Sequence, residues 1–287
     1  MKKNVIVGQS GGPPAVINAS LYGVVYEALM QKEQIGTVYG MINGIEGFLA
    51  DTIMNMNSVE QSGELELIKT TPGSFLGSCR YKLPEDLKDD VYPLLFKKFE
   101  EYSIGYFFYI GGNDSMDTVS KLSRYAQKTN SSILVLGEPK TIDNDLILTD
   151  HTPGFGSAAR YVASTVREIV TDASVYEQKA VTIVEIMGRD AGWLTASSVL
   201  ARKKAGDNPY LVYLPESDFS TEQFIQDVEK SFSKSSSVVV CVSEGIHDAD
   251  GKLIWEYDRS AGLDSFGHKM LSGCGKYLEN LLRIRLG

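Results

Sequence analysis

The chain has 287 residues, a length that can bury a large core and is more typical of two domains than of one. Its net charge of -9 and pI near 5.0 argue against a nucleic-acid binder or a protein that binds membrane surfaces. Cys79, Cys241 and Cys274 are few and widely spaced, which indicates reduced thiols rather than a disulfide framework or a zinc site. No apolar run is long enough to span a bilayer. The sequence therefore predicts a cytoplasmic protein with no nucleic-acid or membrane partner.

The first predicted strand covers residues 4–7 and leads into the glycine-rich segment GQSGGPP. A helix is predicted next, from Ala15 to Leu29, with apolar residues recurring on one face. A glycine turn between a strand and a helix suits phosphate binding, because backbone N–H groups and the positive end of the helix dipole attract an anion. A turn that only packs closely would give the same pattern, so Gly11 and Gly12 alone do not establish a phosphate-binding site.

Two glycine-rich segments follow in the chain. Residues 36–49 are predicted to form a strand and then a loop or the start of a helix. Segment 70–80 (TTPGSFLGSCR) is rich in turn residues and places Arg80 on a loop. A guanidinium there could hold phosphate oxygens through two N–H groups. Most loop arginines are only solvated, so the interpretation of Arg80 depends on its neighbours.

The stretch from Tyr106 to Asp145 carries the strongest pattern. A buried strand at 106–110 ends in GGNDS and is followed by a helix, and a second strand at 133–136 runs into PKTIDND. Both polar clusters therefore fall at carboxyl ends of neighbouring strands, where open α/β sheets bind ligands. The clusters combine carboxylates with one ammonium, a mixture that suits a metal-bound polyphosphate. These charged residues are Asp114, Asp143, Asp145 and Lys140.

The remaining chain alternates strands with helices. The turn-rich segment 150–157 is interpreted as a crossover between domains. The elements predicted after it are a helix at 158–171, a strand at 181–186 ending in MGRDAG, a helix at 193–201, a strand at 210–214, a helix at 221–233, a strand at 238–242 ending in SEG, and a helix at 269–285. The predicted fold class is α/β, with two Rossmann-like domains whose mostly parallel sheets are flanked by helices. The predicted domains are 1–150 and 151–287.

With GGNDS at 111–115, PKTIDND at 139–145 and MGRD at 187–190, the chain resembles the phosphofructokinase family, in particular its pyrophosphate-dependent branch. The resemblance implies phosphoryl transfer to the 1-hydroxyl of fructose 6-phosphate, with Mg²⁺ as cofactor. It implies a first domain that binds the donor, pyrophosphate, and a second that binds the sugar phosphate. Two alternatives are an ATP-dependent 6-phosphofructokinase and a non-catalytic regulatory subunit of the same fold.

The resemblance also assigns roles to individual residues. Asp143 matches the base that takes the proton from the sugar hydroxyl, as a carboxylate within hydrogen-bond reach can. Thr141 matches a residue that touches the transferred phosphoryl group, and Arg80 and Arg189 match arginines that offset charge. A regulatory subunit would have no reason to keep this set, which argues against that alternative.

Binding residues follow from the same resemblance. The residues that match donor-binding positions are Gly11, Gly12, Gly112, Asp114 and Lys140. The residues that match sugar-binding positions are Met187, Gly188 and Glu244, with Thr141, Asp143 and Arg189 beside the reacting group. Simple core packing remains an equal interpretation of Met187. Asp145 matches an acidic position near the metal, and Asn113 stands where much of the family has a metal-binding aspartate. An amide oxygen can still ligate magnesium but adds no charge.

Two positions bear on the choice of donor. The ATP-dependent branch has glycine where this chain has Asp114 and Lys140. A carboxylate about 4 Å from the α-phosphate of ATP would repel it by roughly 4 kcal/mol at an effective dielectric constant near 20. Lys140 supplies a compact positive charge for a small pyrophosphate. These two residues therefore favour pyrophosphate over ATP.

The family continues beyond the position of Gly287 with a segment that grips the sugar 6-phosphate. We therefore expect the chain to be a fragment or a shortened product, truncated at the C-terminal end of its second domain. A homodimer or homotetramer is expected.

Overall fold

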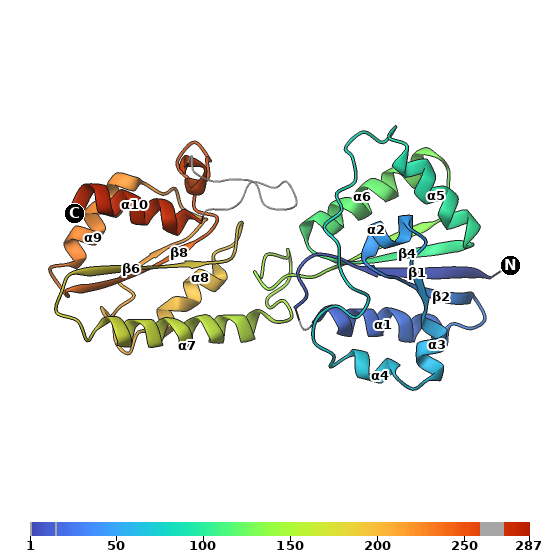
Figure 1. Ribbon diagram of the computed structural model, residues 1–287, viewed down its shortest axis with the longest axis horizontal. Helices are drawn as coiled ribbons and strands as arrows, with labels where there is room; N and C mark the ends of the chain where they lie inside the picture. Colours follow the sequence, from blue (N-terminus) through green and yellow to red (C-terminus); the bar gives the residue numbers. More distant parts are fainter. Residues whose placement is uncertain (1, 15, 259–272) are drawn as a thin grey trace. The chain divides into compact units, whose positions relative to one another are not determined.

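The computed structural model describes residues 2–14, 16–258 and 273–287. The chain divides into two compact units, Met1–Thr141 and Ile142–Gly287 (Figure 1). The sequence placed this boundary after residue 150. The difference arises because Asn144 fastens the intervening loop to the second unit: its side chain donates to the Asp150 carbonyl (3.1 Å) and accepts from the Thr152 N–H (2.8 Å). Ile142 packs against the core of that unit as well.

The first unit is built on a five-stranded sheet in the order β3-β2-β1-β4-β5. Neighbouring strands are parallel except for β2 and β3, which are antiparallel. The strands are β1 (Lys3–Gln9), β2 (Ile35–Met41), β3 (Ile53–Asn55), β4 (Ile104–Gly111) and β5 (Leu134–Pro139). The short β3 was not predicted; the other four were.

Helices cover both faces of this sheet (Figure 1). One face carries α1 (Val16–Met30), α3 (Met56–Gln61) and α4 (Leu65–Ile68); the other carries α2 (Gly44–Leu49), α5 (Val91–Glu101) and α6 (Asn113–Lys128). Ile6 points into one core and Val5 and Val7 into the other, as alternation along β1 requires. Because α1 and α6 leave β1 and β4 toward opposite faces, these neighbouring strands form the topological switch point where such sheets bind ligands.

The second unit has a three-stranded parallel sheet in the order β6-β8-β7. Its strands are β6 (Ala180–Ile186), β7 (Leu211–Tyr213) and β8 (Ser237–Ser243). One face is covered by α7 (Phe155–Ala173), α8 (Trp193–Ser197) and the 3-10 turn Ser198–Ala201. The other face is covered by α9 (Thr221–Ser231) and α10 (Cys274–Leu286). A further 3-10 turn spans Ile254–Tyr257.

The predicted parallel α/β architecture is confirmed in both units. The helix predicted at 193–201 is divided into α8 and a 3-10 turn. The first residues of the helix predicted from 269 lie outside the described residues. All three cysteines are free and buried. In the part of the chain that the structure describes, none of the helices has the length and apolar character needed to cross a membrane.

Candidate active site

The carboxyl ends of β1, β4 and β5 bring the first set of predicted residues together. Beyond the strands, backbone pairing continues: the Ser10 N–H donates to the Ile110 carbonyl (3.0 Å) and the Lys140 N–H donates to the Gly111 carbonyl (2.9 Å). These bonds keep the two glycine turns and the segment after β5 side by side at one edge of the sheet. The GGNDS turn and the start of the second polar cluster, through Thr141, therefore lie next to each other within the first unit, whereas Asp143 and Asp145 belong to the second unit.

Gly11 lies at the centre of this arrangement. Its φ of +77° belongs to the left-handed region, which glycine adopts without steric cost. A Cβ atom placed on Gly11 would lie 3.8 Å from Lys140 Nζ and 4.0 Å from the Gly112 backbone nitrogen. The structure thus brings together Gly11, Gly112 and the Lys140 ammonium, and only 9% of Lys140 is exposed. This donor set, an ammonium beside backbone N–H groups, suits an anion.

The turn after β4 is tightly built. A Cβ on Gly111 would lie 1.9 Å from Ser115 Oγ, which leaves room only for glycine. The Ser115 hydroxyl also pairs with the buried Ser10 hydroxyl (2.8 Å), which ties the two turns together. Gly112 precedes α6 without a side-chain cap, and Asn113 and Asp114 are exposed in the first turn of the helix. The Asp114 carboxylate also interacts favourably with the positive end of the helix dipole, so an acidic residue at this position is stabilising even without a bound phosphoryl donor.

The loop that carries Arg80 is fastened to the Gly11 turn. The Gly11 N–H donates to the Cys79 carbonyl (3.2 Å), and the Ser78 hydroxyl donates to the Gly11 carbonyl (2.7 Å). Arg80 is exposed at the end of this loop, as predicted. Gly12 is exposed too, and a Cβ on it would meet no atom of the described residues within 4 Å. Open space therefore lies beside the Gly11–Gly12 turn.

In the second unit, the carboxyl ends of β6 and β8 hold the other predicted residues. Gly188 has a φ of +125°, and its N–H donates to Glu244 Oε1 (3.1 Å) while its carbonyl accepts from the Ser243 hydroxyl (2.5 Å). A Cβ on Gly245 would lie 1.7 Å from the Arg189 carbonyl oxygen, so the two loops touch. This packing places Arg189 and Glu244 side by side.

Asp143 shares this part of the second unit. Burial raises the pKa of its carboxyl group, and the nearby carboxylates Asp145, Glu244 and Asp190 raise it further, while Arg189 lowers it. The structure thus brings Asp143, Asp145, Arg189 and Glu244 into one electrostatic cluster. A carboxylate whose pKa is raised toward neutrality accepts a proton more readily than an ordinary aspartate.

Asp145 fits a metal ligand in one respect. Its Oδ1 atom is buried and has no hydrogen-bond partner among the described residues. A cation would satisfy this oxygen, because Mg²⁺ is bound through one or two carboxylates together with water and substrate phosphates. Within residues 2–14, 16–258 and 273–287, no group of three or more His, Cys, Asp or Glu side chains is placed to hold a metal ion by itself. Asn113, the other predicted ligand, lies in the first unit and is exposed.

Comparison with known proteins now identifies the family. The family model described as phosphofructokinase matches residues 4–287. The chain belongs to the phosphofructokinase family. It is 41% identical over 284 residues to the "Pyrophosphate--fructose 6-phosphate 1-phosphotransferase" of Rhodospirillum rubrum, covering 99% of this chain and 68% of the relative.

Solved structures of the family agree. The pyrophosphate-dependent phosphofructokinase from Nitrosospira multiformis matches with a TM-score of 0.76 and 34% identity, over 99% of this chain and 67% of that chain. The enzyme of the same description from Marinobacter aquaeolei matches with a TM-score of 0.74 and 36% identity, over 99% of this chain and 66% of that chain. The chain thus spans about two thirds of the length of these family members.

The structure shows the surroundings of two predicted site residues, Met187 and Thr141, and of a third residue near the MGRDAG loop. Met187 is 50% exposed, so core packing does not explain it. Thr141 is half-buried at the end of the first unit, directly before the boundary. Glu216, which follows the strand predicted at 210–214, was not among the predicted site residues; it accepts a hydrogen bond from the Gly192 N–H (2.7 Å) and so fixes the end of the MGRDAG loop. Met187 and Thr141 remain predicted site residues by position; the structure gives their surroundings.

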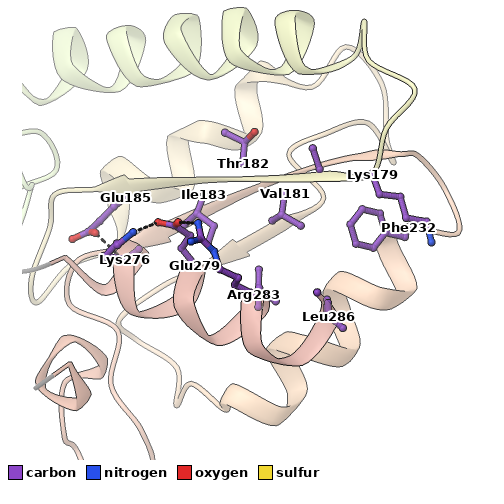
Figure 2. Close-up of a pocket in the computed structure, with 14 residues that line it drawn as sticks. Lys179, Val181, Thr182, Ile183, Glu185, Phe232, Lys276, Glu279, Arg283 and Leu286 are labelled. Atoms are coloured by element: carbon purple, nitrogen blue, oxygen red, sulfur yellow. Dashed lines mark hydrogen bonds and ion pairs between the residues drawn. The ribbon is translucent and has the colours of Figure 1, made fainter. Parts of the chain in front are cut away.

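A hollow elsewhere in the second unit holds none of the predicted residues. Figure 2 shows it between β6 and α10, lined by residues such as Val181, Ile183 and Phe232. Three of its charged side chains pair with one another: Glu279 bonds both Lys276 (2.7 Å) and Arg283 (2.6 Å). The hollow runs along β6, an outer strand of the sheet, and no predicted site residue lines it, so it is not the candidate site of the family.

Proposed function

We propose that this protein transfers a phosphoryl group from pyrophosphate to the 1-hydroxyl of D-fructose 6-phosphate, giving fructose 1,6-bisphosphate and phosphate, in a reversible step of glycolysis. The observation that carries the proposal is the ammonium of Lys140 beside the Gly11 and Gly112 turns, three residues before Asp143. An anion site and a proton acceptor are thus supplied by one short segment of chain. Relatives named for this reaction support the same assignment.

Asp143 acts as the general base. It accepts the proton of the sugar 1-hydroxyl while that oxygen attacks the terminal phosphorus of pyrophosphate. The bond from this phosphorus to the bridging oxygen breaks, and phosphate leaves. The raised pKa of the Asp143 carboxyl group makes it a better match for a hydroxyl proton than an ordinary aspartate would be. Thr141 contacts the transferred group, and Arg80 and Arg189 offset its charge.

The second unit holds the sugar phosphate. One oxygen of the Glu244 carboxylate accepts from the Gly188 N–H, and its remaining lone pairs can accept hydrogen bonds from sugar hydroxyls. Half-exposed Met187 lies against the sugar, and Gly188 allows the chain to turn beneath it. The packing of Gly245 against Arg189 keeps these groups in a fixed arrangement.

The first unit binds the donor. The backbone of Gly11, Gly12 and Gly112 contacts the phosphate oxygens, and Lys140 provides a positive charge for a small ligand. Asp114, in the first turn of α6, repels the extra phosphate of ATP. Both charges therefore favour pyrophosphate as the donor.

Mg²⁺ is the proposed cofactor, with Asp145 and Asn113 as the residues that would hold it. The buried Oδ1 of Asp145, which has no hydrogen-bond partner in the described part of the chain, is the feature that fits a cation. When bound, the ion offsets the negative charge of the pyrophosphate oxygens. The protein is proposed to act in the cytoplasm as a homodimer or homotetramer.

The test is an assay of fructose 1,6-bisphosphate formation with fructose 6-phosphate, Mg²⁺ and either pyrophosphate or ATP. The proposal predicts turnover with pyrophosphate and at most one thousandth of that kcat/KM with ATP. Turnover with ATP alone would identify an ATP-dependent kinase of the same fold. Pyrophosphate-dependent turnover that persists within tenfold in Asp143→Asn would show that another group is the base.

A further inference from the structure

Gln9 is fully buried at the end of β1, and its side-chain amide is saturated with hydrogen bonds. The amide nitrogen donates to the Ile17 carbonyl (3.0 Å) and to Asn18 Oδ1 (3.0 Å). The amide oxygen accepts from the Ser74 hydroxyl (2.9 Å) and from the Leu76 N–H (2.9 Å). One side chain therefore connects the end of β1, the first turn of α1 and the loop around residue 75.

Asn18 extends the same connection. It is also fully buried, and its amide nitrogen donates to the Thr71 carbonyl (2.7 Å) while its oxygen accepts from the Phe75 N–H (2.9 Å). Gln9 and Asn18 together hold the loop through its backbone at three places: Thr71, Phe75 and Leu76.

This loop leads directly to the donor side of the site. Cys79 and Ser78 bond the two backbone groups of Gly11, and Arg80 follows immediately. A loop rich in turn residues has little to hold it by itself. Gln9 fixes it to the strand that ends two residues before Gly11, so the loop and the glycine turn are held in one arrangement.

We infer that Gln9 is a positioning residue of the phosphoryl-donor site, which sets the Gly11 turn and the Arg80 loop relative to each other. Gln9 touches no reacting atom in this role; it acts through Leu76 and the loop that follows. The inference rests on the proposed function only for the location of the donor. It predicts an effect on the donor that is separate from the effect on the sugar.

The test compares Gln9→Met with a matched control at the other end of β1. Methionine keeps the approximate size of glutamine and removes all four hydrogen bonds. The control is Asn4→Leu: the Asn4 amide likewise links neighbouring segments, donating to the Tyr102 carbonyl (2.7 Å) and accepting from the Thr37 N–H (2.7 Å), but at the end of the strand away from the site. For both variants, KM for each substrate, kcat, the unfolding midpoint and amide hydrogen exchange at Leu76 are measured.

We expect Gln9→Met to raise KM for the donor at least tenfold and to speed exchange at Leu76, with KM for fructose 6-phosphate changed less than threefold. Asn4→Leu should leave both KM values within twofold, even where it lowers the unfolding midpoint. Faster exchange at Leu76 with an unchanged donor KM would overturn the inference, because the bonds would then serve stability alone. Equal increases in both KM values would overturn it as well.

A second variant and a second phosphoryl donor cover the cases in which Gln9→Met does not fold or pyrophosphate is not the donor. If Gln9→Met does not fold, Ser74→Ala removes only the hydroxyl whose single proton is shared between Gln9 Oε1 (2.9 Å) and the Gly77 carbonyl (2.6 Å), and a selective rise of at least threefold in donor KM is expected. A value within experimental error of the parent would then refute the inference. If the parent uses ATP and not pyrophosphate, the proposed function fails, and the same comparison made with ATP decides the role of Gln9.

Discussion

Gly11→Ala should weaken binding of the phosphoryl donor without breaking the fold. With a φ of +77°, alanine at this position costs about 1–2 kcal/mol of strain. About 0.4–1 kcal/mol of that is recovered because alanine restricts the unfolded chain. The new methyl group would lie 3.8 Å from Lys140 Nζ, an ordinary van der Waals contact that adds no clash. The expected loss in free energy of unfolding is therefore about 1 kcal/mol.

The effect on the donor should be larger. The methyl group occupies the space between the Gly11 turn and the Lys140 ammonium, where a phosphate oxygen would lie. Loss of one hydrogen bond to a charged group costs about 1.5–3 kcal/mol. Because 1.4 kcal/mol corresponds to a factor of about 10, KM for pyrophosphate should rise about 10- to 100-fold.

Gly63→Ala is the matched control. Gly63 has a φ of +79°, and a Cβ on it meets no atom within 4 Å among the residues that the structure describes, so alanine there carries the same backbone strain in an exposed turn. Denaturant unfolding and steady-state kinetics on both variants separate strain from loss of binding. Similar unfolding free energies are expected, with a changed donor KM in Gly11→Ala alone. An equal donor KM in the two variants would refute the assignment of the Gly11 turn to the donor.

Asp143→Asn should lower kcat at least a hundredfold, because an amide keeps the size of the side chain and cannot accept the proton. Calorimetry should show that the affinity for pyrophosphate is nearly unchanged. A marked loss of that affinity would contradict a role for Asp143 as a base alone. Because burial and neighbouring carboxylates raise the pKa of Asp143, the folded chain binds this proton more tightly than the unfolded chain. The charged form therefore costs stability at neutral pH, so Asp143→Asn should raise the unfolding midpoint at pH 7, and the gain should vanish below about pH 4, where the unfolded carboxyl group is protonated too. For the same reason the acidic limb of kcat/KM should lie above the usual pKa of aspartate, about 3.9, and a limb at or below that value would argue against Asp143 as the base. The double variant Asp114→Gly with Lys140→Gly should shift the preference for ATP over pyrophosphate by about a thousandfold or more. The effects of the two single changes should be non-additive, since both residues act on one ligand. If the double variant still uses pyrophosphate alone, Asp114 and Lys140 do not select the donor.

The parallel architecture could be predicted because its signals are local. Continuous apolar runs such as those of β4 and β8 mark strands buried on both faces, and the polar segments after them mark the ligand edge. Gly188, with its φ of +125°, also stands at a position that the sequence singled out. The family resemblance assigned Lys140 and Gly11 to one donor site, but their proximity depends on β1, β4 and β5 lying side by side, which only the structure shows.

Very short elements, and features that depend on specific contacts between loop residues, could not be predicted. β3 has three residues, and α4 has four, too few for a periodic pattern. The unit boundary at Ile142 depends on the contacts of Asn144 with residues that come six to eight positions later. Gln9 was visible only as part of a glycine-rich turn, because its partners in the loop lie 65 and 67 residues away in the sequence.

The most direct measurement is a competition between donors in one reaction. Equal concentrations of pyrophosphate and ATP are mixed with fructose 6-phosphate, Mg²⁺ and the protein, and the phosphorus resonances of both donors are followed by NMR. If Asp114 and Lys140 select the donor as proposed, the pyrophosphate resonance declines as sugar bisphosphate appears, while the ATP resonances stay constant. Added phosphate should then restore pyrophosphate, because the reaction is reversible. Consumption of ATP ahead of pyrophosphate would contradict the proposed function.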